Sequence, residues 1–361
     1  MNKGIYNFSA GPSMIPPEVL QRAQNELLDF NGIGMGVMEI SHRSLEFEEV
    51  MRNAQNSIRE LMNLPEDFHV LFLQGGASLQ FSMIPMNFLR ENESADYVVT
   101  GTWGEKAVKD AKLFGNVNTV FNSRPTDYKS VAREDEIKFN ENAAYIHYTS
   151  NETIEGVEFK YDLNGGKIPV VCDASSNIMS KPFDVSKYDL IYAGAQKNLG
   201  PSGVTVVIIR DEFMQRAKSN VPRMLDYKVH VENNSMANTP NTFGIYMLGL
   251  VCDWIKEKGG LEAMRKLNEA KAKVLYDALD ASDGFYIGHA AKEARSMMNV
   301  TFRLPDEKLE REFVNQATAN GFDGLKGHRS VGGIRASIYN AFPLVGVEKL
   351  VEFMRDFRRG N

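Results

Sequence analysis

The pattern of hydrophobic positions changes after Pro65, and the change separates two kinds of predicted element. Before this point, two stretches carry apolar residues at helical spacing, at 16–30 and 44–64. The second stretch places these apolar residues on one helical face: Phe47, Val50, Met51, Ala54, Ile58 and Leu61. The spacing predicts two amphipathic helices at the start of the chain.

After Pro65, short apolar runs alternate with amphipathic stretches. The runs lie at 70–73, 97–100, 117–121, 144–148, 168–172, 190–193 and 204–209. Helical patterns at 77–89 and 104–114 separate the first of them. Runs that are apolar at every position are typical of strands that helices cover on both faces. The pattern therefore predicts an α/β fold built on a mostly parallel sheet.

The C-terminal third has a different pattern. Residues 242 to about 282 are almost continuously helical, and Gly259-Gly260 interrupts them as a plausible C-cap and elbow. Further elements are expected in this order: a strand at 298–304, a helix at 307–319, a strand at 333–338 and a helix at 347–357. We therefore expect an N-terminal segment 1–15, a large domain 16–258 and a small α+β domain 259–361.

Composition excludes several classes of protein. The 361 residues include 41 Lys+Arg and 47 Asp+Glu, a net charge of −6, which disfavours coating of nucleic acid or anionic membrane. The longest aliphatic run, 204–209, is too short to span a bilayer, and the first residues lack the apolar core of a signal peptide. Cys172 and Cys252 both lie in apolar stretches, so we expect reduced thiols and a cytoplasmic protein.

Common ligand motifs are missing from the sequence. Gly32-Ile-Gly-Met-Gly36 follows a helical pattern and lacks dinucleotide-loop spacing. Strings for a phosphate-binding loop, a zinc protease, a dithiol or a nucleophile elbow do not occur. The six histidines are scattered, so we expect no metal site.

Asp173 and Lys197 carry the first chemical signal. Asp173 ends the apolar run 168–172, and Lys197 follows the run 190–193 in a loop of small residues. Asp173 alone is more simply explained as a loop cap, but the carboxyl ends of strands are where open α/β sheets bind ligands. Pyridoxal phosphate requires this pair of groups. A lysine of depressed pKa forms a Schiff base with its aldehyde, and a carboxylate keeps its pyridine nitrogen protonated.

Five motifs closely resemble the phosphoserine aminotransferases, a family within the fold-type I, class V aminotransferases. They are Asn7-Phe-Ser-Ala-Gly-Pro, Met38-Glu-Ile-Ser-His42-Arg43, Asp173-Ala-Ser-Ser, Tyr192-Ala-Gly-Ala-Gln-Lys197-Asn-Leu-Gly-Pro-Ser-Gly and Lys326-Gly-His328-Arg329-Ser-Val-Gly-Gly-Ile-Arg335. The resemblance implies a mostly parallel seven-stranded sheet flanked by helices in a large domain that binds pyridoxal phosphate. It also implies a small α+β C-terminal domain, an N-terminal segment near the active site, and a homodimer with shared active sites.

The resemblance also implies the cofactor contacts. Lys197 would bear the Schiff base and Asp173 would pair with the pyridine nitrogen. The other contacts expected from the same subunit are Gly76, Ala77, Trp103, Thr153 and Gln196. Gly76 and Ala77 open a glycine-rich helix start, a place that suits a phosphate. Asn238 and Thr239 would reach the cofactor phosphate of the neighbouring subunit.

Substrate contacts implied by the resemblance are anion binders. Arg335 would clamp the α-carboxylate and His42 with Arg43 would reach the distal anion, supported by His328 and Arg329 from the partner subunit. Ser9 is a further candidate for the carboxylate. The expected reaction transfers the amino group of L-glutamate to 3-phosphohydroxypyruvate, giving O-phospho-L-serine and 2-oxoglutarate in serine biosynthesis. The 4-phosphohydroxy-L-threonine couple of pyridoxine biosynthesis is a further expected substrate pair.

Three alternatives remain at this point. One is another class V aminotransferase, of the alanine–glyoxylate type, which needs no phosphate-binding residues. A cysteine desulfurase needs a reactive thiol on a mobile loop, whereas Cys172 and Cys252 lie in a predicted strand and a predicted helix. The third is a protein that binds pyridoxal phosphate without catalysis, which the combination of Lys197, Asp173 and Arg335 disfavours.

Overall fold

A seven-stranded mixed sheet forms the centre of the computed structural model, which describes residues 4–329 and 331–361. Its strand order is β2-β10-β9-β8-β5-β3-β4. The strands are β2 (Phe68–Leu73), β3 (Ser94–Val99), β4 (Asn116–Asn122), β5 (Ile146–Thr149), β8 (Val170–Asp173), β9 (Leu190–Gly194) and β10 (Thr205–Arg210). Only β10 runs antiparallel to its neighbours in this sheet. The predicted mostly parallel α/β sheet is confirmed.

Helices cover both faces of this sheet because its strands present apolar side chains to both sides. Along β2, Val70 and Phe72 enter one core, whereas Leu71 and Leu73 enter the other. The first face is covered by α1 (Pro17–Glu26), α2 (Leu45–Met62) and α7 (Thr242–Glu257). The second is covered by α3 (Gly76–Phe88), α4 (Thr102–Ala111), α5 (Asp211–Gln215) and α6 (Tyr227–Glu232).

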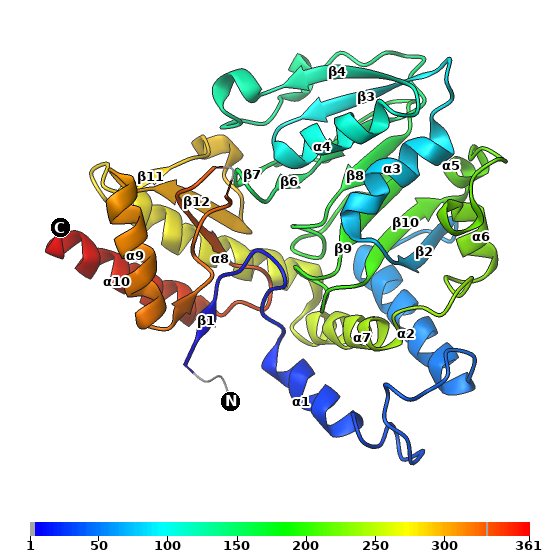
Figure 1. Ribbon diagram of the computed structural model, residues 1–361, viewed down its shortest axis with the longest axis horizontal. Coiled ribbons are helices and arrows are strands. Elements are labelled where there is room, and N and C mark those ends of the chain that lie inside the picture. The colour runs from blue at the N-terminus through cyan, green and yellow to red at the C-terminus, as the bar shows by residue number, and fades with distance from the viewer. Residues whose placement is uncertain (1–3, 330) are drawn as a thin grey trace.

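The C-terminal elements form a second layer around a smaller sheet, to the left of the large sheet in Figure 1. The antiparallel sheet β11-β12-β14 comprises Ile287–Gly288, Asn299–Arg303 and Ile334–Ser337. Its helices are α8 (Gly260–Asp280), α9 (Glu307–Ala319) and α10 (Leu344–Gly360). The N-terminal strand β1 (Tyr6–Asn7) pairs with β13 (Phe322–Asp323), so the start of the chain packs on this C-terminal part.

Helix α8 joins the two parts of the molecule. Gly259 and Gly260, between α7 and α8, have φ values of 100° and 73°, a backbone conformation that favours glycine. Leu261 and Met264 of α8 pack into the core of the large sheet, while Leu275 packs into the C-terminal core. The expected elbow is therefore present, and the domain boundary at 259 remains a prediction. Among the described residues, no helix is long and apolar enough to cross a bilayer.

A hairpin and five short 3-10 turns complete the described elements. The hairpin pairs β6 (Asn151–Glu152) with β7 (Val157–Glu158) and directly follows β5. The 3-10 turns are Arg124–Thr126, Glu134–Glu136, Val185–Lys187, Arg223–Leu225 and Lys292–Ala294.

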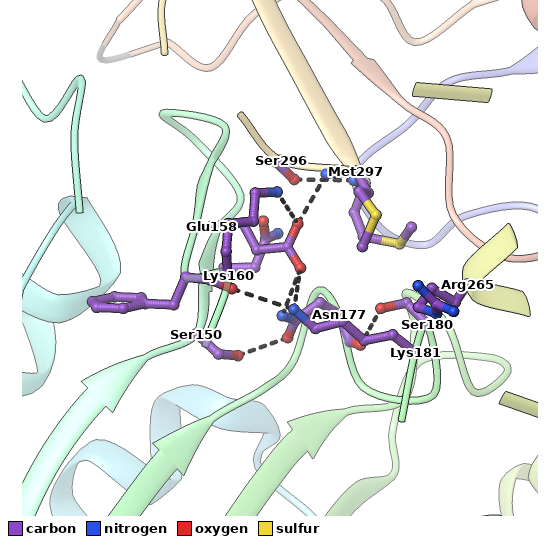
Figure 2. Close-up of polar contacts among 12 residues, drawn as sticks. Ser150, Glu158, Lys160, Asn177, Ser180, Lys181, Arg265, Ser296 and Met297 are labelled. Carbon is purple, nitrogen blue, oxygen red and sulfur yellow. Dashed lines mark hydrogen bonds and ion pairs between the residues drawn. The ribbon is translucent and has the colours of Figure 1, made fainter. Parts of the chain in front are cut away.

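The hairpin meets the C-terminal part through a buried carboxylate, Glu158 (Figure 2). Its oxygens lie 3.1 Å from the amine of Lys181 and 3.3 Å from that of Lys160. Glu158 also accepts hydrogen bonds from Asn177 Nδ2 and from the backbone N–H of Met297, just before β12. This carboxylate therefore connects the large sheet to the C-terminal part by charge-assisted hydrogen bonds.

Candidate active site

The predicted lysine and aspartate lie at neighbouring strand ends. Asp173 is the last residue of β8, and Lys197 follows β9, the adjacent parallel strand. The Lys197 amine donates a hydrogen bond to Thr153 Oγ1 at 2.7 Å. An Asp173 oxygen accepts from the backbone N–H of Ser175 at 2.9 Å, which fixes the orientation of the buried carboxyl group. Parallel strands bring their carboxyl ends to one edge, so the topology itself creates this pairing.

One cavity of about 110 Å³ collects all the cofactor contacts expected from the same subunit. Its lining includes Gly76, Ala77, Trp103, Thr153, Asp173, Gln196 and Lys197. The amine of Lys197 lies 5.9 Å from the centroid of the Trp103 ring, so the indole borders the space beside the lysine. Residues distant in sequence thus converge on one pocket.

The electrostatics of the pair suit a nucleophilic amine. Burial lowers the pKa of Lys197 to about 8, although the charges of Asp173 and Glu152 raise it. At neutral pH about a tenth of the amine is therefore unprotonated. Burial raises the pKa of Asp173, and the charge of Lys197 opposes that rise. A positively charged ring nitrogen next to Asp173 would further favour the carboxylate.

The remaining lining fits pyridoxal phosphate. Thr149 Oγ1 and Asn151 Oδ1 are buried and have no hydrogen-bond partner among residues 4–329 and 331–361, so two polar atoms at the cavity are free for a ligand. Gly76 begins α3 with φ 67°, and a Cβ built on it would meet open space. A helix N-terminus with bare N–H groups is a suitable site for a phosphate.

Arg335 lies beside this cavity, on β14 of the C-terminal sheet. Its side chain is half-buried, and burial lowers the pKa of its guanidinium. Its charge in turn lowers the pKa of Lys197, so the two cations lie close enough to repel each other. Arg335 Nε is buried without a hydrogen-bond partner within the described chain. The guanidinium therefore retains a donor for an incoming anion.

His328 lies near Arg335 in the single chain, and the expectation that it serves the site of a partner subunit remains a prediction. The two side chains line one small pocket together with Thr301. Burial lowers the pKa of His328, and the charge of Arg335 lowers it further. The backbone N–H of Gly327 donates to Gly333 O at 2.8 Å, and that of Arg335 donates to Leu325 O at 2.8 Å. Arg329 is an exposed neighbour on this loop.

Four predicted contacts lie away from this cavity in the single chain. Asn238 and Thr239 are exposed and contact Gln74, through bonds of 3.4 Å that involve its side chain. His42 and Arg43 belong to the segment between α1 and α2, which Figure 1 draws at the lower right, and neither lines the cavity. The expected contacts of Asn238 and Thr239 with a neighbouring subunit's cofactor phosphate, and of His42 and Arg43 with the distal anion, remain predictions.

The N-terminal segment reaches the catalytic loop. Ser9 lies against Gly324 in the C-terminal part, outside the lining of the lysine cavity. Ser13 donates from its backbone N–H to Gln196 O and from its hydroxyl to Lys197 O. The sequence analysis did not select Ser13, although its position directly after the Asn7-Phe-Ser-Ala-Gly-Pro motif was a usable signal.

Two buried carboxyl groups were also missed. Glu152 and Glu155 flank Thr153 in the hairpin loop, and both are buried. Their proximity to Thr153 in the sequence was visible, but their contacts with α4 depend on the tertiary fold. Cys172 and Cys252 are buried thiols, and burial raises the pKa of each to about 12. Neither is suited to the thiolate chemistry of a desulfurase.

Comparison with known proteins identifies the family to which the chain belongs. The family model for aminotransferase class-V matches residues 5–350. The chain is 53% identical over 359 residues to a phosphoserine aminotransferase of Lysinibacillus sphaericus, covering 99% of each chain. It is 54% identical over 355 residues to that of Bacillus subtilis, covering 98% of each.

Solved structures agree in fold. The phosphoserine aminotransferase of Bacillus circulans subsp. alkalophilus superposes with a TM-score of 0.97 at 52% identity, covering 99% of each chain. A pyridoxal-phosphate-bound phosphoserine aminotransferase from Trichomonas vaginalis gives 0.92 at 43% identity, covering 97% of this chain and 99% of the other. The chain belongs to the class V aminotransferase family.

Proposed function

We propose that this protein is a pyridoxal-phosphate-dependent phosphoserine aminotransferase. It transfers the amino group of L-glutamate to 3-phosphohydroxypyruvate, giving O-phospho-L-serine and 2-oxoglutarate in serine biosynthesis. The observation that carries the proposal is the position of Lys197, whose pKa is lowered to about 8, beside Asp173 and within the electrostatic reach of Arg335. The shared identity with proteins named for this activity extends over the whole chain.

The cofactor is held by groups that the cavity already presents. Asp173 would hold a proton on the pyridine nitrogen, Trp103 would lie beside the ring, and the start of α3 at Gly76 and Ala77 would receive the phosphate together with Gln196. When bound, pyridoxal phosphate supplies an aldehyde that bonds to amines and a ring that accepts electrons from Cα. The protein's task is to position this chemistry and to move protons.

Lys197 is the residue that moves protons. Its unprotonated amine accepts the proton from Cα of the amino donor and returns a proton during the second half of the reaction. Thr153 Oγ1, as a hydrogen-bond acceptor at 2.7 Å, directs the amine while it carries the proton. The lowered pKa keeps the acid and base forms of the lysine accessible near neutral pH.

Substrate selection comes from cations around Lys197. The planar guanidinium of Arg335 clamps the α-carboxylate by paired hydrogen bonds. His328 and Arg329, from the loop that folds onto β14, extend this positive surface. His42 and Arg43 of a second subunit bind the distal anion, which is the side-chain carboxylate of glutamate or the phosphate of the acceptor. Ser9 supports the carboxylate from the N-terminal segment.

A homodimer is part of the proposal. Large apolar side chains in the segment 28–45, which includes His42 and Arg43, are exposed in the single chain, among them Leu28 at 86%, Met38 at 61% and Leu45 at 78%. A second copy that covers this apolar surface would carry the neighbouring cations to the other active site. Asn238 and Thr239 would serve the partner's cofactor phosphate in the same assembly. The two separate buried thiols suit a reducing, cytoplasmic location.

The decisive experiment compares amino transfer from glutamate to 3-phosphohydroxypyruvate and to 3-hydroxypyruvate. The phosphorylated acceptor should react with a kcat/KM at least about a hundredfold higher, because several charged hydrogen bonds are lost without the phosphate. Equal rates would refute a phosphate-binding site and favour an aminotransferase of the alanine–glyoxylate type. A protein that binds pyridoxal phosphate without reacting with glutamate would support the non-catalytic alternative.

A further inference from the structure

The N-terminus of α4 is held by two carboxyl groups from another part of the chain. Glu152 accepts hydrogen bonds from the backbone N–H groups of Gly104 at 2.8 Å and Trp103 at 3.1 Å. Glu155 accepts from the backbone N–H of Thr102 at 3.0 Å and from its hydroxyl at 2.5 Å. Three N–H groups of the first turn are thus satisfied by side chains of the β6–β7 hairpin.

This arrangement differs from an ordinary helix cap. A cap is normally supplied by the residue that precedes the helix, but here that residue is Gly101, which has no side chain. Burial and the charge of Glu155 raise the pKa of Glu152, and burial also raises that of Glu155. Two buried carboxyl groups side by side are costly to maintain, and one small polar N-cap would satisfy the helix at a lower cost.

The hairpin connects α4 to the lysine. Thr153, between the two carboxyl groups in sequence, accepts the hydrogen bond of Lys197. The backbone oxygen of Glu155 accepts from Thr301 Oγ1 at 2.6 Å, and Thr301 lies opposite Arg335 in the C-terminal sheet. One short loop therefore contacts the helix that carries Trp103, the amine of Lys197 and β12, the strand that pairs with the strand of Arg335.

We propose that Glu152 and Glu155 are positioning residues that fix the Trp103 ring relative to Lys197 and so determine how tightly the cofactor ring is held. The proposal rests on the proposed function, because it assigns the space between Trp103 and Lys197 to pyridoxal phosphate. Glu152 acts most directly, since it holds the backbone N–H of Trp103 itself. Neither carboxyl group lines the cavity, so both act through the residues that do.

Gly101 offers a way to displace both groups without changing any charge. A Cβ at this position would lie 2.5 Å from Glu152 Cδ and 2.6 Å from Glu155 Oε2. The backbone of Gly101 is extended, with φ −179°, so alanine adopts it without strain. Gly101→Ala therefore tests the position of the carboxyl groups independently of their ionisation.

The experiment measures the fluorescence of Trp103. The sequence has two tryptophans, so a Trp254→Phe background leaves Trp103 as the sole source of tryptophan fluorescence. Acrylamide quenching of the cofactor-free protein measures how well the ring is held, and quenching of Trp103 emission by added pyridoxal phosphate measures the cofactor Kd. We expect Glu152→Ala to increase acrylamide quenching and to raise the cofactor Kd about tenfold, because charged hydrogen bonds are lost. Glu152→Gln retains one acceptor and should show a smaller effect.

The matched control is Asp306→Ala, which removes the side chain that caps α9 by accepting from Leu309 N at 2.9 Å, outside the cavity. It should lower the thermal midpoint without changing either Trp103 readout.

If Glu152→Ala does not fold, Glu155→Gln and Gly101→Ala provide the same readouts. The proposal is overturned if the carboxyl variants leave quenching and Kd unchanged, or if Asp306→Ala changes them equally. A wild-type protein that fails to bind pyridoxal phosphate would refute the proposed function, while acrylamide quenching would still test the positioning role.

Discussion

The amine of Lys197 donates to the hydroxyl oxygen of Thr153 at 2.7 Å, and this bond links the loop after β9 to the hairpin after β5. The same hairpin holds the start of α4 through Glu152. A hydrogen-bond acceptor stabilises the protonated amine, whereas burial destabilises it. This hydroxyl group from another segment thus favours the protonated form of the candidate nucleophile, as do the charges of Asp173 and Glu152.

Replacement of Thr153 by valine should lower the pKa of Lys197 below its value of about 8, because the acceptor for the charged amine is lost. The rate at which cofactor-free protein binds pyridoxal phosphate should then reach its half-maximum at a lower pH. Thr205→Val is the control, since Thr205 Oγ1 is buried with no hydrogen-bond partner among the described residues. An unchanged pH midpoint in Thr153→Val would contradict the prediction.

Replacement of Lys197 by alanine should reduce turnover by roughly 10³-fold or more, because the residue that bonds the cofactor and moves the Cα proton is lost. The visible absorbance that pyridoxal phosphate acquires on the wild-type protein should also disappear. Lys271→Met is a control, since Lys271 is a buried lysine that donates to the backbone oxygens of Ile338 and Tyr339 and does not line the cavity. It should retain the absorbance. Wild-type absorbance in Lys197→Ala would refute the assignment.

Mixed dimers test which subunit supplies the anion binders. Arg43→Ala should lower kcat/KM at least about tenfold, because charged hydrogen bonds to the distal anion are lost. Random reassociation of this variant with Lys197→Ala should restore about a quarter of wild-type activity, since half of the dimers contain one complete site of two. His328 lies with Arg335 of its own chain, so His328→Ala mixed with Lys197→Ala should restore none. Recovery of activity in both mixtures, or in neither, would contradict the proposal that Arg43 acts on the neighbouring subunit's site and His328 on its own.

The sequence was sufficient for most elements of the large sheet and for the central pair of residues. Strands buried on both faces leave mostly apolar runs, and six of the seven runs correspond to such strands, whereas the run 117–121 corresponds to the partly exposed edge strand β4. Asp173 and Lys197 were identifiable because a carboxylate and a lysine at the ends of such runs are chemically unusual. The direction of β10 was not predictable from its apolar run, because a strand covered on both faces has the same composition in either orientation.

Residues whose role depends on tertiary contacts could not be identified from the sequence. Glu152 and Glu155 resemble ordinary loop carboxylates until α4 is placed above them. Ser13 acquires its role only when the N-terminal segment lies on the loop of Lys197. The subunit whose site His328 serves is equally inaccessible to the sequence, because motif spacing contains no information about which chain a loop contacts. These cases share one physical cause, a contact between segments far apart in sequence.

The lowered pKa of Glu158 predicts how the free energy of unfolding depends on pH. Burial disfavours its charged form, but Lys181 and Lys160 outweigh that effect and lower its pKa from 4.5 to about 2 (Figure 2). Because the pKa of Glu158 is lower in the folded state, its contribution of about 3 kcal/mol is complete above pH 4.5 and is lost as the pH falls towards 2. Glu158→Gln should therefore lower the thermal midpoint of the cofactor-free protein at pH 7, and the difference from wild type should shrink below pH 4.5.

The matched control for Glu158 is Glu60→Gln, which removes an ion pair with Lys256 whose glutamate side chain is 63% exposed. Exposed pairs contribute little, so its midpoint should remain close to wild type across the same range. A Glu158→Gln difference that stays constant from pH 7 to pH 3 would show that packing, and not the charge, accounts for the loss. A shrinking difference would identify the ion pairs of Glu158 as an acid-sensitive connection between the large sheet and the C-terminal part, since Met297 N binds the same carboxylate.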